Sequence, residues 1–124
     1  MREILVRIKR AVLNGRYAFS EKARMEMESD RLAELDIAES ILNATTIYKT
    51  VRSTSLSRRG TRERLYVIES TNLTGLSIYT KGKLVKEVGQ EIYYFLHIGE
   101  EIALSAGETH GENYNLSDLR QQED

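Results

Sequence analysis

Aromatic and basic side chains recur at two-residue spacing in the C-terminal half of the chain, the spacing that puts side chains on one face of a β-strand. The residues that this alternation predicts to share a face are Arg62, Arg64, Tyr66, Tyr79, Lys81, Tyr93, Phe95 and His97. Such a face suits RNA, because rings and guanidinium planes stack unpaired bases while Arg and Lys hold phosphates. We therefore expect RNA contacts from Tyr66, and phosphate contacts from Arg62, Arg64, Lys81 and Lys83.

The same residue types also have a purely structural interpretation. A tyrosine on a strand often packs its ring against the core and keeps its hydroxyl in water. His97 can be a half-buried strand histidine whose hydrogen bonds are satisfied, and cations on an edge strand protect a sheet against aggregation. Both interpretations stay open at the level of the sequence.

Charge is distributed unevenly along the chain, although the net charge is only −1. The segment from Lys49 to Lys86 has nine basic and two acidic residues, 9 − 2 = +7. After Gly99 there are seven acids against Arg120 alone, 1 − 7 = −6. A basic middle with an acidic end favours a polyanionic partner, and the alternative is a solvated sheet face with a solubilising tail.

Hydrophobic periodicity predicts an α+β fold, with N-terminal helices packed on one face of a four-stranded antiparallel sheet. The period of 3.6 residues predicts helices over 2–14, 21–29 and 37–43, with Ser20 and Asp36 as N-caps. From Thr45 the period changes to two, and four strands joined by short turns predict an antiparallel meander. Gly82 interrupts the third strand, which indicates a β-bulge or the close approach of a ligand.

Length and composition predict one domain over residues 1–104, followed by an acidic and mostly disordered tail over 105–124. The chain has no cysteine and two histidines, so we expect no disulfide, no metal site and no cofactor. No apolar run approaches the roughly 20 residues that span a bilayer, and no targeting signal is visible. We therefore expect a cytoplasmic protein with no membrane partner.

Several short motifs resemble known bacterial toxins. The segment from Phe19-Ser20-Glu21-Lys22-Ala23 to Ile47 resembles the start of the family called domain of unknown function 4258, within the RelE/ParE toxin superfamily. The same stretch is similar to the MqsR ribonuclease toxins. Three further motifs also resemble these toxins: Asn14-Gly15-Arg16, Ile47-Tyr48-Lys49-Thr50, and the pair of Tyr79 with Lys81. The resemblance covers about residues 5–98.

This resemblance implies a RelE-like fold and a metal-independent mRNA endonuclease that an antitoxin protein holds inactive. By motif match it assigns Lys49 as an electrostatic clamp and Tyr79 as a base or positioning group. His97 is our candidate acid from its strand position, where the toxin pattern has a Lys. The chain departs from the 4258 pattern in helix two, where Lys22 replaces a His and Glu26 replaces an Arg.

Three hypotheses follow: an RNA-cleaving toxin, a module of the same fold that binds RNA or protein without cleavage, and an interaction protein that dimerises through its sheet edge. For the acidic tail we consider weak competition with RNA for the basic groove, and the alternative is a solubilising role only.

Overall fold

The first two helices form where the 3.6-residue period predicts them. The computed structural model describes residues 2–56 and 62–101 of the chain. Helix α1 (Arg2–Leu13) buries Leu5, Ile8, Ala11 and Val12 and ends before Gly15, which adopts a positive φ of 76°. Helix α2 (Glu21–Ser29) begins after Ser20, whose Oγ accepts a hydrogen bond from the Ala23 backbone N–H at 3.0 Å. The predicted N-cap at Ser20 is therefore confirmed.

Helix α3 (Glu34–Asn43) ends where predicted but begins three residues earlier. Asp36 is not its N-cap. Its Oδ2 instead accepts a hydrogen bond from the backbone N–H of Ala33 at 2.8 Å, the backward half of a capping box. The predicted helix start is wrong because an Asp near a helix N-terminus can act in two ways. As an N-cap it accepts a backbone N–H from the first turn, and as a residue of the first turn it accepts the N–H of the N-cap residue.

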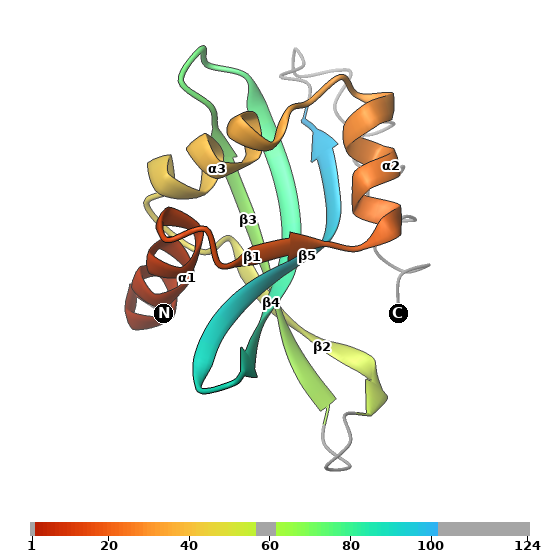
Figure 1. Ribbon diagram of the computed structural model, residues 1–124. Helices are drawn as coiled ribbons and strands as arrows, with labels where there is room; N and C mark the ends of the chain where they lie inside the picture. Colours follow the sequence, from red (N-terminus) through yellow and green to blue (C-terminus); the bar gives the residue numbers. More distant parts are fainter. Residues whose placement is uncertain (1, 57–61, 102–124) are drawn as a thin grey trace.

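Within residues 2–56 and 62–101 the sheet has five strands in the order β1-β5-β4-β3-β2, so the predicted count of four is wrong (Figure 1). The strands are β1 (Tyr17–Phe19), β2 (Lys49–Leu56), β3 (Arg62–Thr71), β4 (Ser77–Glu87) and β5 (Gln90–Glu100). Strands β2 to β5 form the predicted antiparallel meander. Strand β1 pairs in parallel with β5, and three residues are too few to show an alternating pattern.

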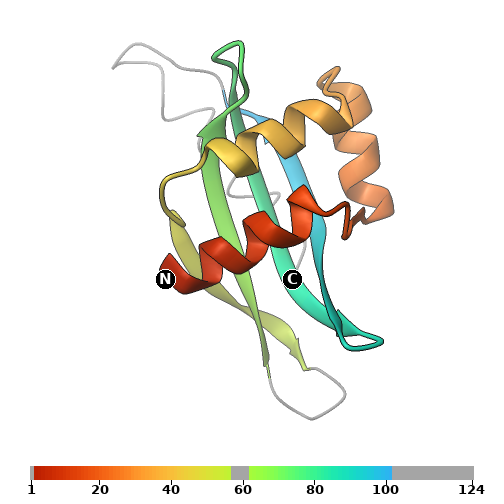
Figure 2. The same cartoon turned by 60° about the vertical axis from the view of Figure 1, so that its left-hand side comes forward.

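Helices α1 and α3 lie side by side across one face of the sheet, here called the helix face (Figure 2). Helix α2 flanks the sheet beside β5 and β1. The core that these helices cover includes Tyr66, Tyr93 and Phe95, each less than a tenth exposed. The prediction that these three rings form an exposed, RNA-facing surface is therefore wrong, because they pack on the helices. The mixed α+β class is confirmed, and the resemblance to RelE-like packing stays a prediction.

A bulge in β5 explains why simple alternation failed there. Lys81 lies opposite His97, but the next residue, Gly82, lies opposite Phe95, so Leu96 is the extra residue. The bulge turns His97 to the face opposite Phe95. Gly82 is required on β4 because a Cβ there would lie 2.7 Å from Cζ of Tyr93. The register does shift at Gly82, but the bulge predicted on this strand lies on its neighbour β5, and the close approach is that of a core ring.

No helix within residues 2–56 and 62–101 is long and apolar enough to cross a membrane. The predicted tail over 105–124, and most of the predicted turn between β2 and β3, lie outside the described residues.

Candidate functional site

A row of four residues crosses the sheet on the face opposite α1 and α3, here called the second face. Lys49 of β2 pairs with Val67 of β3, Val67 pairs with Lys81 of β4, and Lys81 pairs with His97 of β5. Directly paired residues point to the same side of a sheet. Tyr79 lies two residues before Lys81 on β4 and therefore shares this face. The second face thus carries all three residues predicted as catalytic: Lys49, Tyr79 and His97.

Strand spacing decides which of these groups can act together. Neighbouring strands lie about 4.8 Å apart, so Lys81 is the immediate neighbour of His97. Lys49 is three strand spacings from His97, about 14 Å. A single phosphate group held at His97 is therefore within easy reach of Lys81, while Lys49 can reach only a more distant phosphate.

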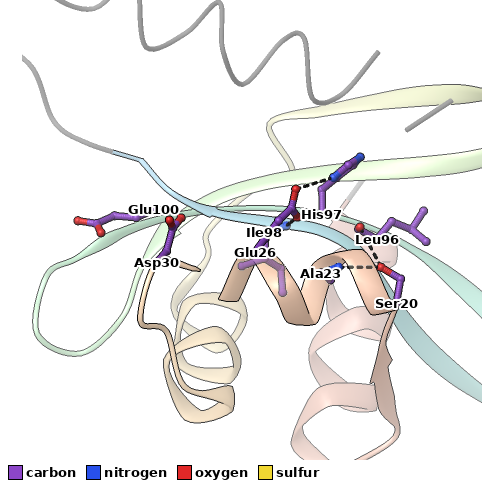
Figure 3. A network of polar contacts seen from close by, with 8 residues as sticks. All are labelled: Ser20, Ala23, Glu26, Asp30, Leu96, His97, Ile98 and Glu100. Atoms are coloured by element: carbon purple, nitrogen blue, oxygen red, sulfur yellow. Dashed lines mark hydrogen bonds and ion pairs between the residues drawn. The ribbon is translucent and has the colours of Figure 1, made fainter. Parts of the chain in front are cut away.

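His97 is held by a carboxylate from α2 (Figure 3). Its Nδ1 lies 3.2 Å from Oε2 of Glu26, and the other carboxylate oxygen accepts the backbone N–H of Ile98 at 2.9 Å. A carboxylate at Nδ1 favours the tautomer with a proton on that nitrogen. Nε2 is then the nitrogen that can exchange a proton with a substrate.

The edge of the sheet explains why Glu26 lies there. Strand β1 ends at Phe19, whose partner is Phe95, so it does not reach the last part of β5. Two carboxylates at the C-terminal end of α2 replace the missing strand: Glu26 accepts the N–H of Ile98, and the C-cap residue Asp30 accepts the N–H of Glu100 at 2.9 Å (Figure 3). Glu26 and Asp30 are four residues apart and so lie on one side of the helix. The backbone bond thereby positions the carboxylate for His97.

The central residues of this site are buried. Tyr79, Lys81 and His97 are 2%, 1% and 2% exposed, whereas Lys49 is exposed. Burial strengthens electrostatic interactions inside the site, because less water screens the charges. It also means that a polymer cannot contact these three side chains without displacing whatever covers them.

The residues predicted to bind RNA do not share one face. Arg64 is exposed but pairs with Arg52, in the same alternation as the core residue Tyr66, so it belongs to the helix-face side. Tyr66 is 6% exposed and packs in the core. Lys83 lies on the second face, where its Nζ binds Oε1 of Glu63 at 3.0 Å. The side chain of Arg62 lies outside the described part of the structure. Of the predicted cations, Lys49, Lys81 and Lys83 are therefore the ones gathered on the second face.

Glu26 is the site residue that sequence analysis missed. It entered that analysis only as a departure from a toxin motif. The available signal was the pair of acids Glu26 and Asp30 at a spacing of four on α2. That spacing indicates a shared side of the helix, but only the three-dimensional pairing shows that this side meets the open edge of β5.

Other polar features lie away from this site. Arg7 binds Glu91 with two hydrogen bonds, and this contact lowers the pKa of the Glu91 carboxyl and raises that of the guanidinium. Burial raises the pKa of the core residue Tyr93. A pocket of about 300 Å³ near the start of α1 is lined by Arg2, Leu5, Thr45, Thr46 and Ile47, none of them a predicted site residue. Within the described ranges, no three His, Asp or Glu side chains form a group that could hold a metal ion.

Comparison with known protein families, curated proteins and solved structures found no match to this chain. The resemblance to the RelE/ParE toxins therefore remains an expectation from short motifs.

Proposed function

We propose that this protein is an endoribonuclease of the toxin type, which binds single-stranded RNA on the second face and cleaves it at His97 without a metal ion. An antitoxin protein would hold it inactive. The observation that carries the proposal is the Glu26–His97 pair with the ammonium-bearing Lys81 directly beside it on the next strand. Cleavage of a phosphodiester needs proton transfer and stabilisation of negative charge, and an oriented histidine next to a cation can supply both.

In the proposed reaction, a ribose 2′-oxygen attacks the neighbouring phosphorus and the bond from phosphorus to the 5′-oxygen breaks. The 2′-oxygen loses its proton to a water molecule, and the leaving 5′-oxygen gains one from His97 Nε2. Glu26 holds the imidazole in position through Nδ1, and Lys81 offsets the negative charge on the phosphoryl oxygens. Tyr79 would position the ribose or phosphate, since an ordinary tyrosine, with a pKa of about 10, is a poor base at neutral pH.

The geometry changes one role that the motif match assigned. Lys49 lies about 14 Å from His97, three strand spacings away, and so does not share its phosphate. Lys81 takes the part of the electrostatic clamp. Lys49 is exposed, and in this proposal it binds a phosphate further along the strand.

The proposal is tested first in bacteria. Expression of the full-length protein without a partner is expected to slow growth, and His97→Gln or Lys81→Gln to restore it. Lys86→Gln is the matched control, because Lys86 is an exposed lysine on the same strand. It lies five residues from Lys81, and the alternation of side chains along a strand places it on the opposite face of the sheet. Immunoblots confirm equal soluble amounts. Normal growth with abundant wild-type protein, or equal toxicity of all variants, would refute the proposal.

A second candidate function is RNA or protein binding without cleavage. Its specific support is that His97 is 2% exposed and bonded to Glu26, as a purely structural histidine would be. In this case RNA is recovered at full length after binding. His97→Gln then changes the stability of the protein but not the length of the recovered RNA.

A further inference from the structure

Four apolar side chains are exposed on the outer side of the layer that α1 and α3 form over the sheet. Val6 and Leu13 of α1 are 44% and 71% exposed, and Leu35 and Leu42 of α3 are 67% and 39% exposed. At about 100° per residue, each lies about 130–170° round its helix from the middle of the buried stripe. The four side chains, here called the outer patch, therefore point away from the sheet.

The arrangement of the two helices brings these side chains into one patch. Helices α1 and α3 lie side by side and run in opposite directions (Figure 2). Arg2, at the start of α1, lines the same pocket as Thr45, which follows the end of α3. The Val6 end of α1 thus lies by the Leu42 end of α3, and the other two members of the patch lie by each other. Apolar side chains that gather in this way indicate an interaction surface, whereas single exposed ones are common.

The two helices that carry the outer patch have opposite charge. Helix α1 has a net charge of 4 − 1 = +3, and α3 has 0 − 3 = −3. The charged residues are Arg2, Glu3, Arg7, Lys9 and Arg10 on α1, and Glu34, Asp36 and Glu39 on α3. Among the described contacts, Arg7 alone of these cations has an ion pair, and Glu34 alone of the three acids of α3 has one, with Arg24. Asp36 and Glu39 accept hydrogen bonds from uncharged donors, which do not neutralise their charge.

A second copy of the chain complements this surface in both charge and shape. A two-fold axis parallel to the helices and midway between them places α1 of each copy on α3 of the other. A basic helix then lies on an acidic one twice, and Val6 meets the partner's Leu42 while Leu13 meets the partner's Leu35. An axis across the helices would place like-charged helices together. We propose that two copies of this protein form a dimer through the outer patch, with α1 of each copy on α3 of the other.

The size of the surface sets the expected strength of the dimer. Helices of 12 and 10 residues are about 18 and 15 Å long, and each is about 10 Å wide. The outer surface of the pair is therefore about 18 by 20 Å, smaller than the roughly 800 Å² that each partner buries in a standard interface. We expect a reversible dimer with a Kd in the micromolar range.

The dimer would leave both candidate RNA sites on its outside. The outer patch and the second face lie on opposite sides of the sheet, so the two second faces would point away from each other. Dimerisation therefore does not depend on the proposed function, and His97→Gln is expected to leave the Kd of the dimer unchanged.

Self-association is tested by sedimentation equilibrium of the full-length protein at low salt, from the micromolar to the millimolar range. Leu13→Gln is expected to raise the Kd at least about tenfold, because the two-fold axis counts each substitution twice. Met25→Gln is the matched control, since Met25 is a 64% exposed apolar residue on the neighbouring helix α2. A wild-type protein that stays monomeric over the whole range would overturn the proposal, and so would equal Kd values for the two variants.

The arrangement of the helices is tested by exchanging charges. In the register that the outer patch sets, Arg10 lies within one turn of the partner's Glu39. Arg10→Glu and Glu39→Lys are each expected to weaken self-association at least about tenfold, because each places like charges together twice. An equal mixture of the two variants restores opposite charges at both contacts and is expected to form a dimer, with circular dichroism showing that each variant is folded. Self-association of either variant at the wild-type Kd, or a mixture that stays monomeric, would overturn the proposed pairing of α1 with α3.

Discussion

Replacement of Glu26 separates its structural role from its role at His97. Its carboxylate accepts two hydrogen bonds, from the backbone of Ile98 at 2.9 Å and from His97 Nδ1 at 3.2 Å. In Glu26→Gln the amide oxygen can still accept the bond from Ile98, but the amide nitrogen then faces Nδ1. Because that nitrogen is a donor, the histidine must move its proton to Nε2. We therefore expect a folded protein that carries the wrong tautomer.

The magnitudes follow from these two bonds. Glu26→Ala leaves a backbone N–H without its charged acceptor and is expected to destabilise the protein by about 2–4 kcal/mol, whereas Glu26→Gln costs about 1 kcal/mol. The wrong tautomer is expected to lower the cleavage rate about 10²- to 10⁴-fold, by analogy with the loss of the orienting carboxylate in the Ser-His-Asp triad. The measurements are urea unfolding, ¹⁵N chemical shifts of the imidazole, and RNA cleavage.

Asp30→Asn provides the matched control. Asp30 accepts a backbone N–H of β5 in the same way but has no histidine beside its carboxylate in the described contacts. We expect a small loss of stability and no change in cleavage. If Glu26→Gln keeps both the wild-type imidazole spectrum and the wild-type cleavage rate, the reasoning about the Glu26–His97 pair is refuted.

Three further predictions concern stability. Gly82→Ala should lower the free energy of unfolding by about 1–3 kcal/mol, because its Cβ would meet the ring of Tyr93 and the carbonyl of Tyr94, each at 2.7 Å; an unchanged urea midpoint would contradict this packing. Tyr93→Phe should stabilise by about 1 kcal/mol, since no described residue bonds this buried hydroxyl, and a loss of stability would show that it has a partner. The hydrogen bond from Arg7 lowers the pKa of Glu91 in the folded state, so the stability that Glu91 contributes is complete above the pKa of an unfolded Glu, about 4.3, and is lost as pH falls through the folded pKa. Glu91→Gln should therefore flatten the fall in urea midpoint between about pH 5 and 3. Parallel curves for the variant and the wild type would argue against the Arg7 contact.

The elements of the fold were largely predictable from the sequence because their signals are local. Ser20 caps α2 as its residue type and position predict, and the period of two located β2 to β5. Strand β1 was missed because its only evidence is a parallel pairing with β5, more than 70 residues away in the chain. Such a pairing leaves no pattern within a window of neighbouring residues.

The candidate site was harder to predict because side-chain direction depends on one bulge. Alternation placed Phe95 and His97 on the same face, and the extra residue Leu96 separates them. The same alternation correctly grouped Tyr79 with Lys81, where no irregularity lies between them. Glu26 could not be assigned, because nothing local indicates that α2 completes the edge of β5.

The most direct test of the proposed function is the chemistry of the RNA ends after incubation with the full-length protein in the presence of a metal chelator. Cleavage by the proposed route leaves a 2′,3′-cyclic phosphate on one fragment and a 5′-hydroxyl on the other, and His97→Gln should yield neither. RNA that binds to the protein but is recovered intact, or fragments with a 5′-phosphate, would contradict the account.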